Sequence, residues 1–134
     1  MTDFETPLGG YPRLVVKGAD DAIVFLKRTI GGVLEDRFAD PDGRVVYSKL
    51  MLGDVPLSIV EEVQEWGWTS PQTLGGSPVL MQLDFENCDE VAARMLAHDA
   101  EVVVAIQDRA YGKREGRLRD PFGHLWILSQ DLAA

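Results

Sequence analysis

The stretch that decides the fold is Tyr111-Gly-Lys-Arg-Glu-Gly-Arg-Leu-Arg-Asp-Pro-Phe-Gly-His-Leu-Trp126. It contains Asp120-Pro121-Phe122-Gly123, whose residue types favour a tight turn. We expect strands on both sides of this turn, over 116–119 and 124–130, joined as a hairpin. The last strand alternates, because Trp126 and Leu128 fall on one side and Ile127 on the other.

The hairpin has a counterpart earlier in the chain. Gly43-Arg44-Val45 leads to the two-residue turn Gly53-Asp54 and then to Leu57-Ser58-Ile59. Gly116-Arg117-Leu118 leads in the same way to Trp126-Ile127-Leu128. A repeat of this length indicates two similar units, neither of which buries its sheet face alone.

Each unit predicts a strand, a helix and three more strands. In the first unit the ranges are 11–17, 21–30, 33–39, 45–52 and 55–62. In the second they are 78–85, 88–98, 101–106, 116–119 and 124–130. Asp20 and Asn87 are the expected N-caps of the two helices. The fold class is therefore α+β, as one domain over 1–134 with a first βαβββ module at about 11–62, a linker at about 63–77 and a second module at about 78–130. We expect the modules to form a curled mixed sheet around a cleft.

Composition narrows the class of partner. The chain has 134 residues and a formal charge of −9, from 22 acidic and 13 basic residues. This charge repels phosphate backbones and argues against nucleic acid as a partner. No apolar run approaches the ~20 residues that span a bilayer, and the N-terminus shows no secretory signal, so we expect no membrane contact and a cytoplasmic location. Cys88 is the only cysteine, which excludes an internal disulfide and a cysteine-based metal site.

Three stretches resemble one family: 22–31 in the first helix, 70–78 in the linker, and above all 111–126. They are similar to the vicinal oxygen chelate superfamily, which holds glyoxalase I, bleomycin-resistance proteins and extradiol dioxygenases, and within it to the PhnB-like branch. The resemblance covers the chain from Tyr11 to Gln130. It implies paired βαβββ modules assembled as a homodimer.

The resemblance also implies where a metal would bind. Enzymes of this superfamily hold a divalent ion with His and Glu side chains, one from the first and one from the last strand of each module. These places fall at or near Tyr11, at Ser58, at 80–82 and at Ile127. None of them holds His, Asp or Glu, and isoleucine cannot ligate. We therefore expect no metal, no cofactor and no catalytic residue.

Strand alternation predicts which side chains face the cleft. If Ser58 faces it, Leu57 and Ile59 face the helices; the same alternation puts Gln82 and Ile127 in the cleft. The predicted cleft face is mixed apolar and polar, as ligand pockets tend to be. Its members are Tyr11, Arg13, Val15, Ser58, Val60, Leu80, Gln82, Asp84, Ile127 and Ser129.

Further side chains are candidates for the ligand site, each with a structural alternative. Trp66, Trp68 and Tyr111 either stack on a flat ligand or cover a seam, an interface or a loop. Arg13 and Arg114 bind an anionic group or form internal ion pairs. The predicted ligand-binding set is Tyr11, Arg13, Phe38, Tyr47, Ser58, Trp66, Trp68, Gln82, Tyr111, Arg114 and Ile127.

These patterns leave three hypotheses. The first is a metal-independent protein of the bleomycin-resistance type that sequesters an aromatic or cationic small molecule, such as a drug or natural product. The second is a lyase, isomerase or dioxygenase with a displaced metal site using Glu61, Asp84 or Glu86. The third is an interaction module with a collapsed cleft. His98 and His124 are expected to be structural, because a metal site needs converging ligands.

Overall fold

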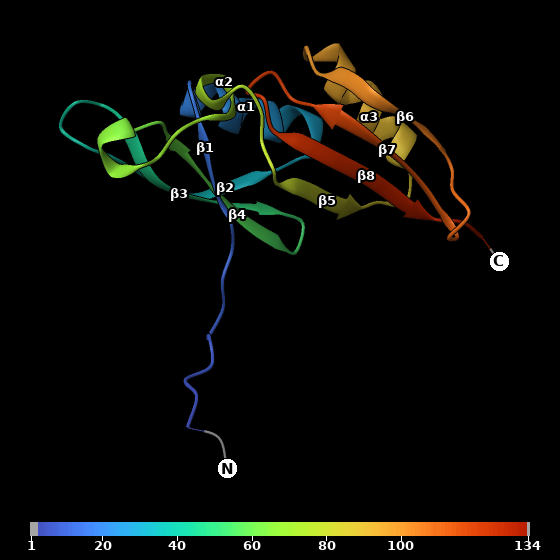
Figure 1. The fold of residues 1–134 in the computed structure, drawn as a ribbon, viewed down its shortest axis with the longest axis horizontal. Helices are drawn as coiled ribbons and strands as arrows, with labels where there is room; N and C mark the ends of the chain where they lie inside the picture. The colour runs from blue at the N-terminus through green and yellow to red at the C-terminus, as the bar shows by residue number, and fades with distance from the viewer. Residues whose placement is uncertain (1–2, 134) are drawn as a thin grey trace.

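The computed structural model describes residues 3–133 and has the predicted α+β architecture of two βαβββ modules (Figure 1). The first module comprises β1 (Arg13–Val16), α1 (Ala19–Thr29), β2 (Val33–Ala39), β3 (Val45–Leu52) and β4 (Val55–Glu61). The second comprises β5 (Leu80–Asp84), α3 (Cys88–Ala97), β6 (Glu101–Asp108), β7 (Lys113–Arg119) and β8 (Leu125–Asp131). The linker contains the 3₁₀ turn η1 (Gln64–Trp66) and the short helix α2 (Pro71–Leu74).

Each module folds its strands into one four-stranded mixed sheet. The strand orders are β1-β4-β3-β2 and β5-β8-β7-β6, so that the first and last strands of each module are parallel neighbours. The helix between the first two strands supplies the crossover that a parallel pair requires. The mixed sheet is therefore two hydrogen-bonded sheets rather than one continuous sheet.

One hydrophobic core serves both modules. Side chains from the helix-facing sides of both sheets, such as Ile59 and Leu128, belong to the same buried cluster as α1 and α3. The two helices contact each other, as Figure 1 shows, and the Arg94 side chain of α3 donates to the Thr29 carbonyl at the end of α1 (2.9 Å). Phe25 of α1 also packs edge-on against Phe122, with ring centroids 6.3 Å apart.

The turn between β7 and β8 is fixed from inside the protein. The buried Asp120 carboxylate accepts hydrogen bonds from the Trp126 indole (2.8 Å) and from the backbone N–H groups of Phe122 and His124 (2.9 and 3.0 Å). Burial nevertheless raises the pKa of Asp120. His124 is 7 % exposed, and its Nε2–H donates to the Val15 carbonyl at 2.9 Å. The predicted turn thus ties the second module to β1.

The start of α1 differs from the prediction. Asp20 is not the N-cap: the cap is Gly18 at φ +94°, and the Glu61 carboxylate of β4 accepts from Gly18 N (3.0 Å) and Ala19 N (2.9 Å). Asp20 lies in the first turn and binds the Arg37 guanidinium instead (2.8 Å). The cap of α3 is confirmed, since the Asn87 side chain accepts from Glu90 N at 3.2 Å.

Candidate functional site

The open face of the first sheet carries the side chains that point away from the helices. In β1 and β4, Arg13 is opposite Ser58 and Val15 is opposite Val60. Their neighbours Leu14 and Ile59 belong to the core, as the predicted alternation requires. Ser58 is fully buried, and its Oγ has no hydrogen-bond partner among the described residues. The first sheet therefore has a buried, unpaired hydroxyl directly beside Arg13.

A group of aromatic and basic side chains covers this face. The Arg13 guanidinium carbon lies 5.7 Å from the Tyr47 ring centroid and 5.5 Å from that of Trp68. The Tyr11 and Tyr47 hydroxyls are 3.3 Å apart, which raises the pKa of Tyr47 because a hydrogen bond between them favours the neutral form. The Lys49 ammonium lies 5.7 Å from the Tyr11 ring. We call Tyr11, Arg13, Tyr47, Lys49, Trp66 and Trp68 the aromatic cluster.

The two tryptophans lie in a loop that closes on itself directly after β4. Val63 and Trp68 form a two-way backbone bridge, and the two indole rings meet edge-on with centroids 5.1 Å apart. The Glu62 carboxylate accepts from Ser70 N at 2.7 Å, and this hydrogen bond holds the pKa of Glu62 at about 2. Trp66 remains 53 % exposed. The loop thus presents indole surface to solvent from a fixed base.

The predicted residues do not all meet. Tyr11, Arg13, Tyr47, Trp66 and Trp68 converge above Ser58, and Phe38 lies beside them, opposite Tyr47 in the β2–β3 register and 61 % exposed. The other candidates belong to the second module. These residues are Gln82 on β5, Tyr111 in the loop before β7, Arg114 on β7 and Ile127 on β8.

On the second sheet, Gln82 of β5 is opposite Ile127 of β8, as predicted from their alternation. Tyr111 lies in the loop before β7, is 63 % exposed, and its hydroxyl donates to Glu115. It borders a cavity of about 220 Å³ over β6 and β7 whose lining also includes Arg117. The described residues that line this cavity belong to the second module and include no member of the aromatic cluster.

Arg114 lies on the opposite, helix-facing side of the second sheet. Its guanidinium donates to Asp89 at 2.7 and 3.1 Å and to Asp108 at 3.0 Å, and both carboxylates raise its pKa. Of the two roles considered for Arg114, the structure therefore shows the internal ion pair. The nearby Cys88 thiol is buried, and desolvation raises its pKa, as expected for an inert cysteine.

The side chains offered for a displaced metal site do not converge. Glu61 is engaged at the N-terminus of α1, and Asp84 and Glu86 border a separate surface hollow with Asp131. Within residues 3–133, no group of three or more His, Cys, Asp or Glu side chains is placed to hold a metal ion. The four places implied by the resemblance carry tyrosine, serine, residues 80–82 and isoleucine, a donor set that does not fit a divalent metal.

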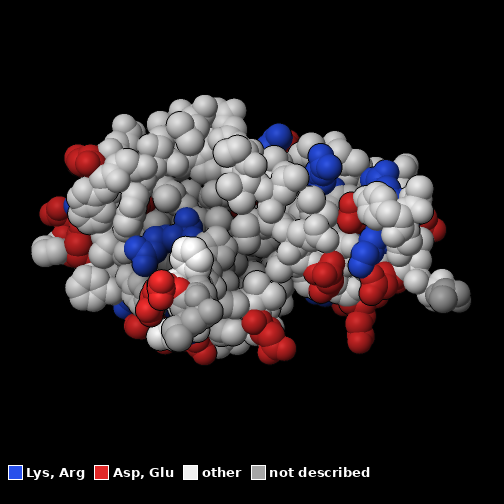
Figure 2. Space-filling model, turned by 60° about the horizontal axis from the view of Figure 1, so that its bottom comes forward, with Lys and Arg blue, Asp and Glu red and all other residues white. Residues whose placement is uncertain are grey.

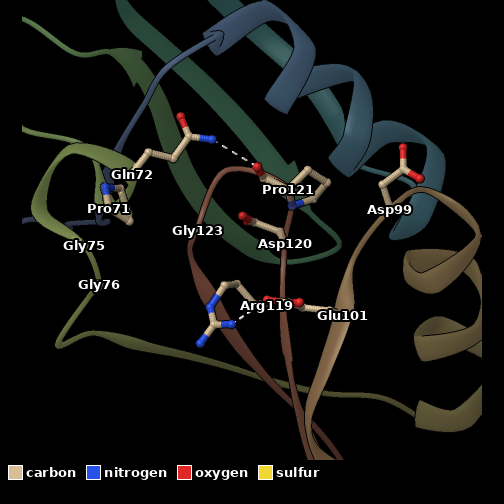
Figure 3. Close-up of a pocket in the computed structure, with 10 residues that line it drawn as sticks. All are labelled: Pro71, Gln72, Gly75, Gly76, Asp99, Glu101, Arg119, Asp120, Pro121 and Gly123. Carbon is tan, nitrogen blue, oxygen red and sulfur yellow. Dashed lines mark hydrogen bonds and ion pairs between the residues drawn. The ribbon is translucent and has the colours of Figure 1, made fainter.

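Sequence reasoning missed a cavity of about 390 Å³ between α2, the Asp120–Gly123 turn and the connection from α3 to β6 (Figure 3). The sequence does contain a signal for α2, the helix that borders this cavity. Ser70-Pro71 marks the start of the helix and Gly75 its end. Its polar groups are largely paired: Gln72 Nε2 donates to the Pro121 carbonyl (3.2 Å), and Arg119 binds Glu101. Figure 3 shows the Arg119 and Glu101 side chains meeting at its lower edge. This cavity is best described as a seam between the linker and the second module.

None of the helices in the described chain is long and apolar enough to cross a membrane.

Residues 10–128 match the sequence model of one protein family, the Glyoxalase/Bleomycin resistance protein/Dioxygenase superfamily. The uncharacterized protein Mb0911c of Mycobacterium bovis is 36 % identical over 122 residues, which cover 89 % of this chain and 80 % of that protein.

Two solved structures from Bacillus cereus share the fold. The glyoxalase family protein APC24694 has a TM-score of 0.77 at 19 % identity, covering 99 % of each chain. The PhnB protein has a TM-score of 0.68 at 17 % identity, covering 90 % of this chain and 97 % of the other. At these identities the likeness is one of architecture.

Proposed function

Because this chain belongs to the Glyoxalase/Bleomycin resistance protein/Dioxygenase superfamily, we propose that it sequesters a small organic molecule as the bleomycin-resistance type does, without a metal ion. Fold alone does not fix function in so varied a superfamily, so the proposal depends on the site. The observation that carries it is the aromatic cluster on the open face of the first sheet.

The cluster has the features of a stacking site. Aromatic side chains gather there while keeping surface open to solvent, with Tyr11 38 % and Trp66 53 % exposed. Exposed apolar surface that is gathered rather than scattered marks binding sites in soluble proteins. The hydrogen bond from Ser70 to Glu62 and the bridge between Val63 and Trp68 restrain the rings before any ligand arrives, which reduces the entropy lost on binding.

The metal-independent mode is supported by the donor set. Ser58 and Ile127 stand where the family's enzymes would need strong ligands, and Glu61 already serves the α1 N-terminus. Of the two ligand chemistries expected from the sequence, aromatic and cationic, we favour the aromatic one. Arg13 and Lys49 stand against the ring faces, so a second cation placed there would be repelled.

The proposal is tested by a calorimetric screen of the purified protein against bleomycin-like, mitomycin-like and aromatic polyketide compounds. At least one aromatic compound is expected to bind more tightly than 1 mM, which corresponds to about 4 kcal/mol. Trp68→Ala is expected to weaken that binding at least tenfold, whereas Tyr111→Ala, an exposed aromatic outside the cluster, should leave it within twofold.

Two results would overturn the proposal. If no compound binds, the cleft has collapsed and the interaction-module hypothesis replaces it. If metal analysis of the purified protein finds stoichiometric, tightly held Zn, Ni, Mn or Fe, the metal-dependent enzyme hypothesis is preferred.

We further propose that the protein acts as a cytoplasmic homodimer without nucleic-acid or membrane partners. The homodimer is supported by the exposed apolar residues Val102, Val103 and Val104 on the edge strand β6, which offer a surface for contact between two copies of the chain. Light scattering coupled to size-exclusion chromatography should give twice the 14.8 kDa chain mass. A monomer at micromolar concentration would contradict this part of the proposal.

A further inference from the structure

Arg13 is an arginine without an acidic partner in a strongly acidic protein. The chain has 22 acidic residues and a formal charge of −9. Several arginines of the described chain, unlike Arg13, form an ion pair with a carboxylate. They are Arg37, Arg44, Arg94, Arg114 and Arg119. Over residues 3–133, by contrast, the Arg13 guanidinium enters no hydrogen bond or ion pair, and its contacts are with the rings of Tyr47 and Trp68. Its charge is therefore available to a ligand.

The ring contacts leave the hydrogen-bonding capacity of Arg13 unused. An aromatic ring attracts a guanidinium through its quadrupole and accepts no conventional hydrogen bond in doing so. The guanidinium carries five N–H donors in a planar fork that matches a carboxylate with two parallel hydrogen bonds. Tyr47 and Trp68 hold the group 5.7 and 5.5 Å from their ring centroids, so less side-chain freedom is lost when an anion binds.

The surroundings favour a single negative charge. The second basic group of the cluster, Lys49, lies 3.8 Å from Glu35 and is already partly neutralised. One unpaired guanidinium therefore faces the ligand, which suits a carboxylate better than a doubly charged phosphate. Figure 2 shows basic side chains set in a hollow on the half of the molecule that carries the first sheet. Exposed ring surface of Tyr11 and Trp66 lies in the same cluster.

We infer that the aromatic cluster selects planar aromatic carboxylates, with the carboxylate on the Arg13 fork and the ring system against the exposed aromatic side chains. This inference rests on the proposed function and specifies the charge of its ligand. It differs from the cationic chemistry that the acidic composition alone would favour, because the unpaired Arg13 guanidinium is positive in a chain whose net charge is negative.

The test uses three probes with one ring system and different charges: 2-naphthoate, 2-naphthamide and 2-naphthylmethylammonium. Isothermal calorimetry at pH 7 and low salt should show 2-naphthoate binding at least about tenfold more tightly than the amide, as expected for a charge-assisted pair of hydrogen bonds. The ammonium probe should bind most weakly. Arg13→Gln should reduce the preference for naphthoate over the amide to less than twofold.

Arg28→Gln is the matched control. Arg28 is exposed in the last turn of α1 and its replacement changes the net charge by the same amount. This variant should keep the full preference for naphthoate, and circular dichroism should confirm that both variants are folded. A loss of preference in both variants would show that net charge, and not Arg13, selects the ligand.

The outcomes separate the inference from the proposed function. If the amide or the ammonium probe binds as tightly as naphthoate, charge selection is refuted while binding of aromatic molecules stands. If Arg13→Gln weakens all three probes equally, Arg13 only holds the rings, and the inference is again refuted. If none of the probes binds, the inference fails, and the compound screen decides separately whether the protein binds aromatic molecules at all.

Discussion

Replacing Ser48 by alanine is expected to destabilise the protein far more than replacing Ser58, although both serines are fully buried in neighbouring strands. The Ser48 hydroxyl donates to the Ile59 carbonyl at 2.6 Å and accepts from Ile59 N at 2.8 Å. The regular β3–β4 pairing extends only from Leu52 opposite Val55 to Leu50 opposite Leu57. Beyond this pairing, the Ser48 side chain of β3 supplies the hydrogen bonds to the backbone of β4.

The magnitude follows from the groups left behind. Ser48→Ala leaves a buried N–H and a buried C=O of Ile59 without partners, at about 1–3 kcal/mol each, partly offset by removing the hydroxyl, so we expect about 3 kcal/mol in total. For a chain of 134 residues this lowers the Tm by about 10 °C. Ser58→Ala removes a hydroxyl that has no partner, and should change stability by less than about 0.5 kcal/mol or increase it.

Urea unfolding followed by tryptophan fluorescence measures both differences, with circular dichroism as a second probe to check that the transition is two-state. Equal losses for the two variants would refute the reasoning, because the two sites differ in hydrogen bonding and not in burial. A large loss for Ser58→Ala alone would show that its hydroxyl is engaged and that the open face of the first sheet is organised differently.

Two further predictions concern the loop and the second sheet. The pKa of Glu62 is held at about 2, below its ordinary 4.5, so its contribution to stability is present above pH 4.5 and lost as the pH falls towards 2; Glu62→Gln should flatten the pH dependence of urea midpoints over that window. Gly116→Ala places a Cβ 2.7 Å from Ile106 atoms and should cost about 1–3 kcal/mol by overpacking. Gly76→Ala meets no atom within 4 Å and should be near neutral in the same denaturation assay, so equal costs would argue against the β6–β7 packing.

Much of the fold is predictable because each strand carries a local signal. The alternation of Ser58 and Val60 with Leu57 and Ile59 fixes which side meets the helices, and the structure confirms that Leu57 and Ile59 are in the core. Turn residues such as Asp120-Pro121-Phe122-Gly123 locate the strand ends. These signals need no knowledge of distant contacts.

Features that depend on distant contacts were missed or misplaced. The cap of α1 comes from Glu61, which reaches Gly18 only after β4 has paired with β1. The position of Arg114 follows from strand alternation once the full length of β7 is known. β7 begins at Lys113, and counting in steps of two from the buried Leu118 places Arg114 on the helix-facing side. The predicted strand began too late to use this rule.

The candidate site was predictable residue by residue but not as a unit. Residue type and predicted position singled out Arg13 on the first strand, Tyr47 on the strand at 45–52 and Trp68 in the linker, each separately. Their meeting requires the parallel register of β1 with β4 and the bridge that brings Trp68 back to Val63.

The strand order has a consequence for how the chain folds during synthesis. In the second sheet β8 lies between β5 and β7, so β5 has no strand partner within its own sheet until residues 85–124 and then β8 have been made. A nascent second module thus leaves β5 without its strand partner for the whole of that interval, and an unpaired strand edge favours aggregation. Slowing translation after β5 should therefore lower the yield of folded protein more than slowing it after β8.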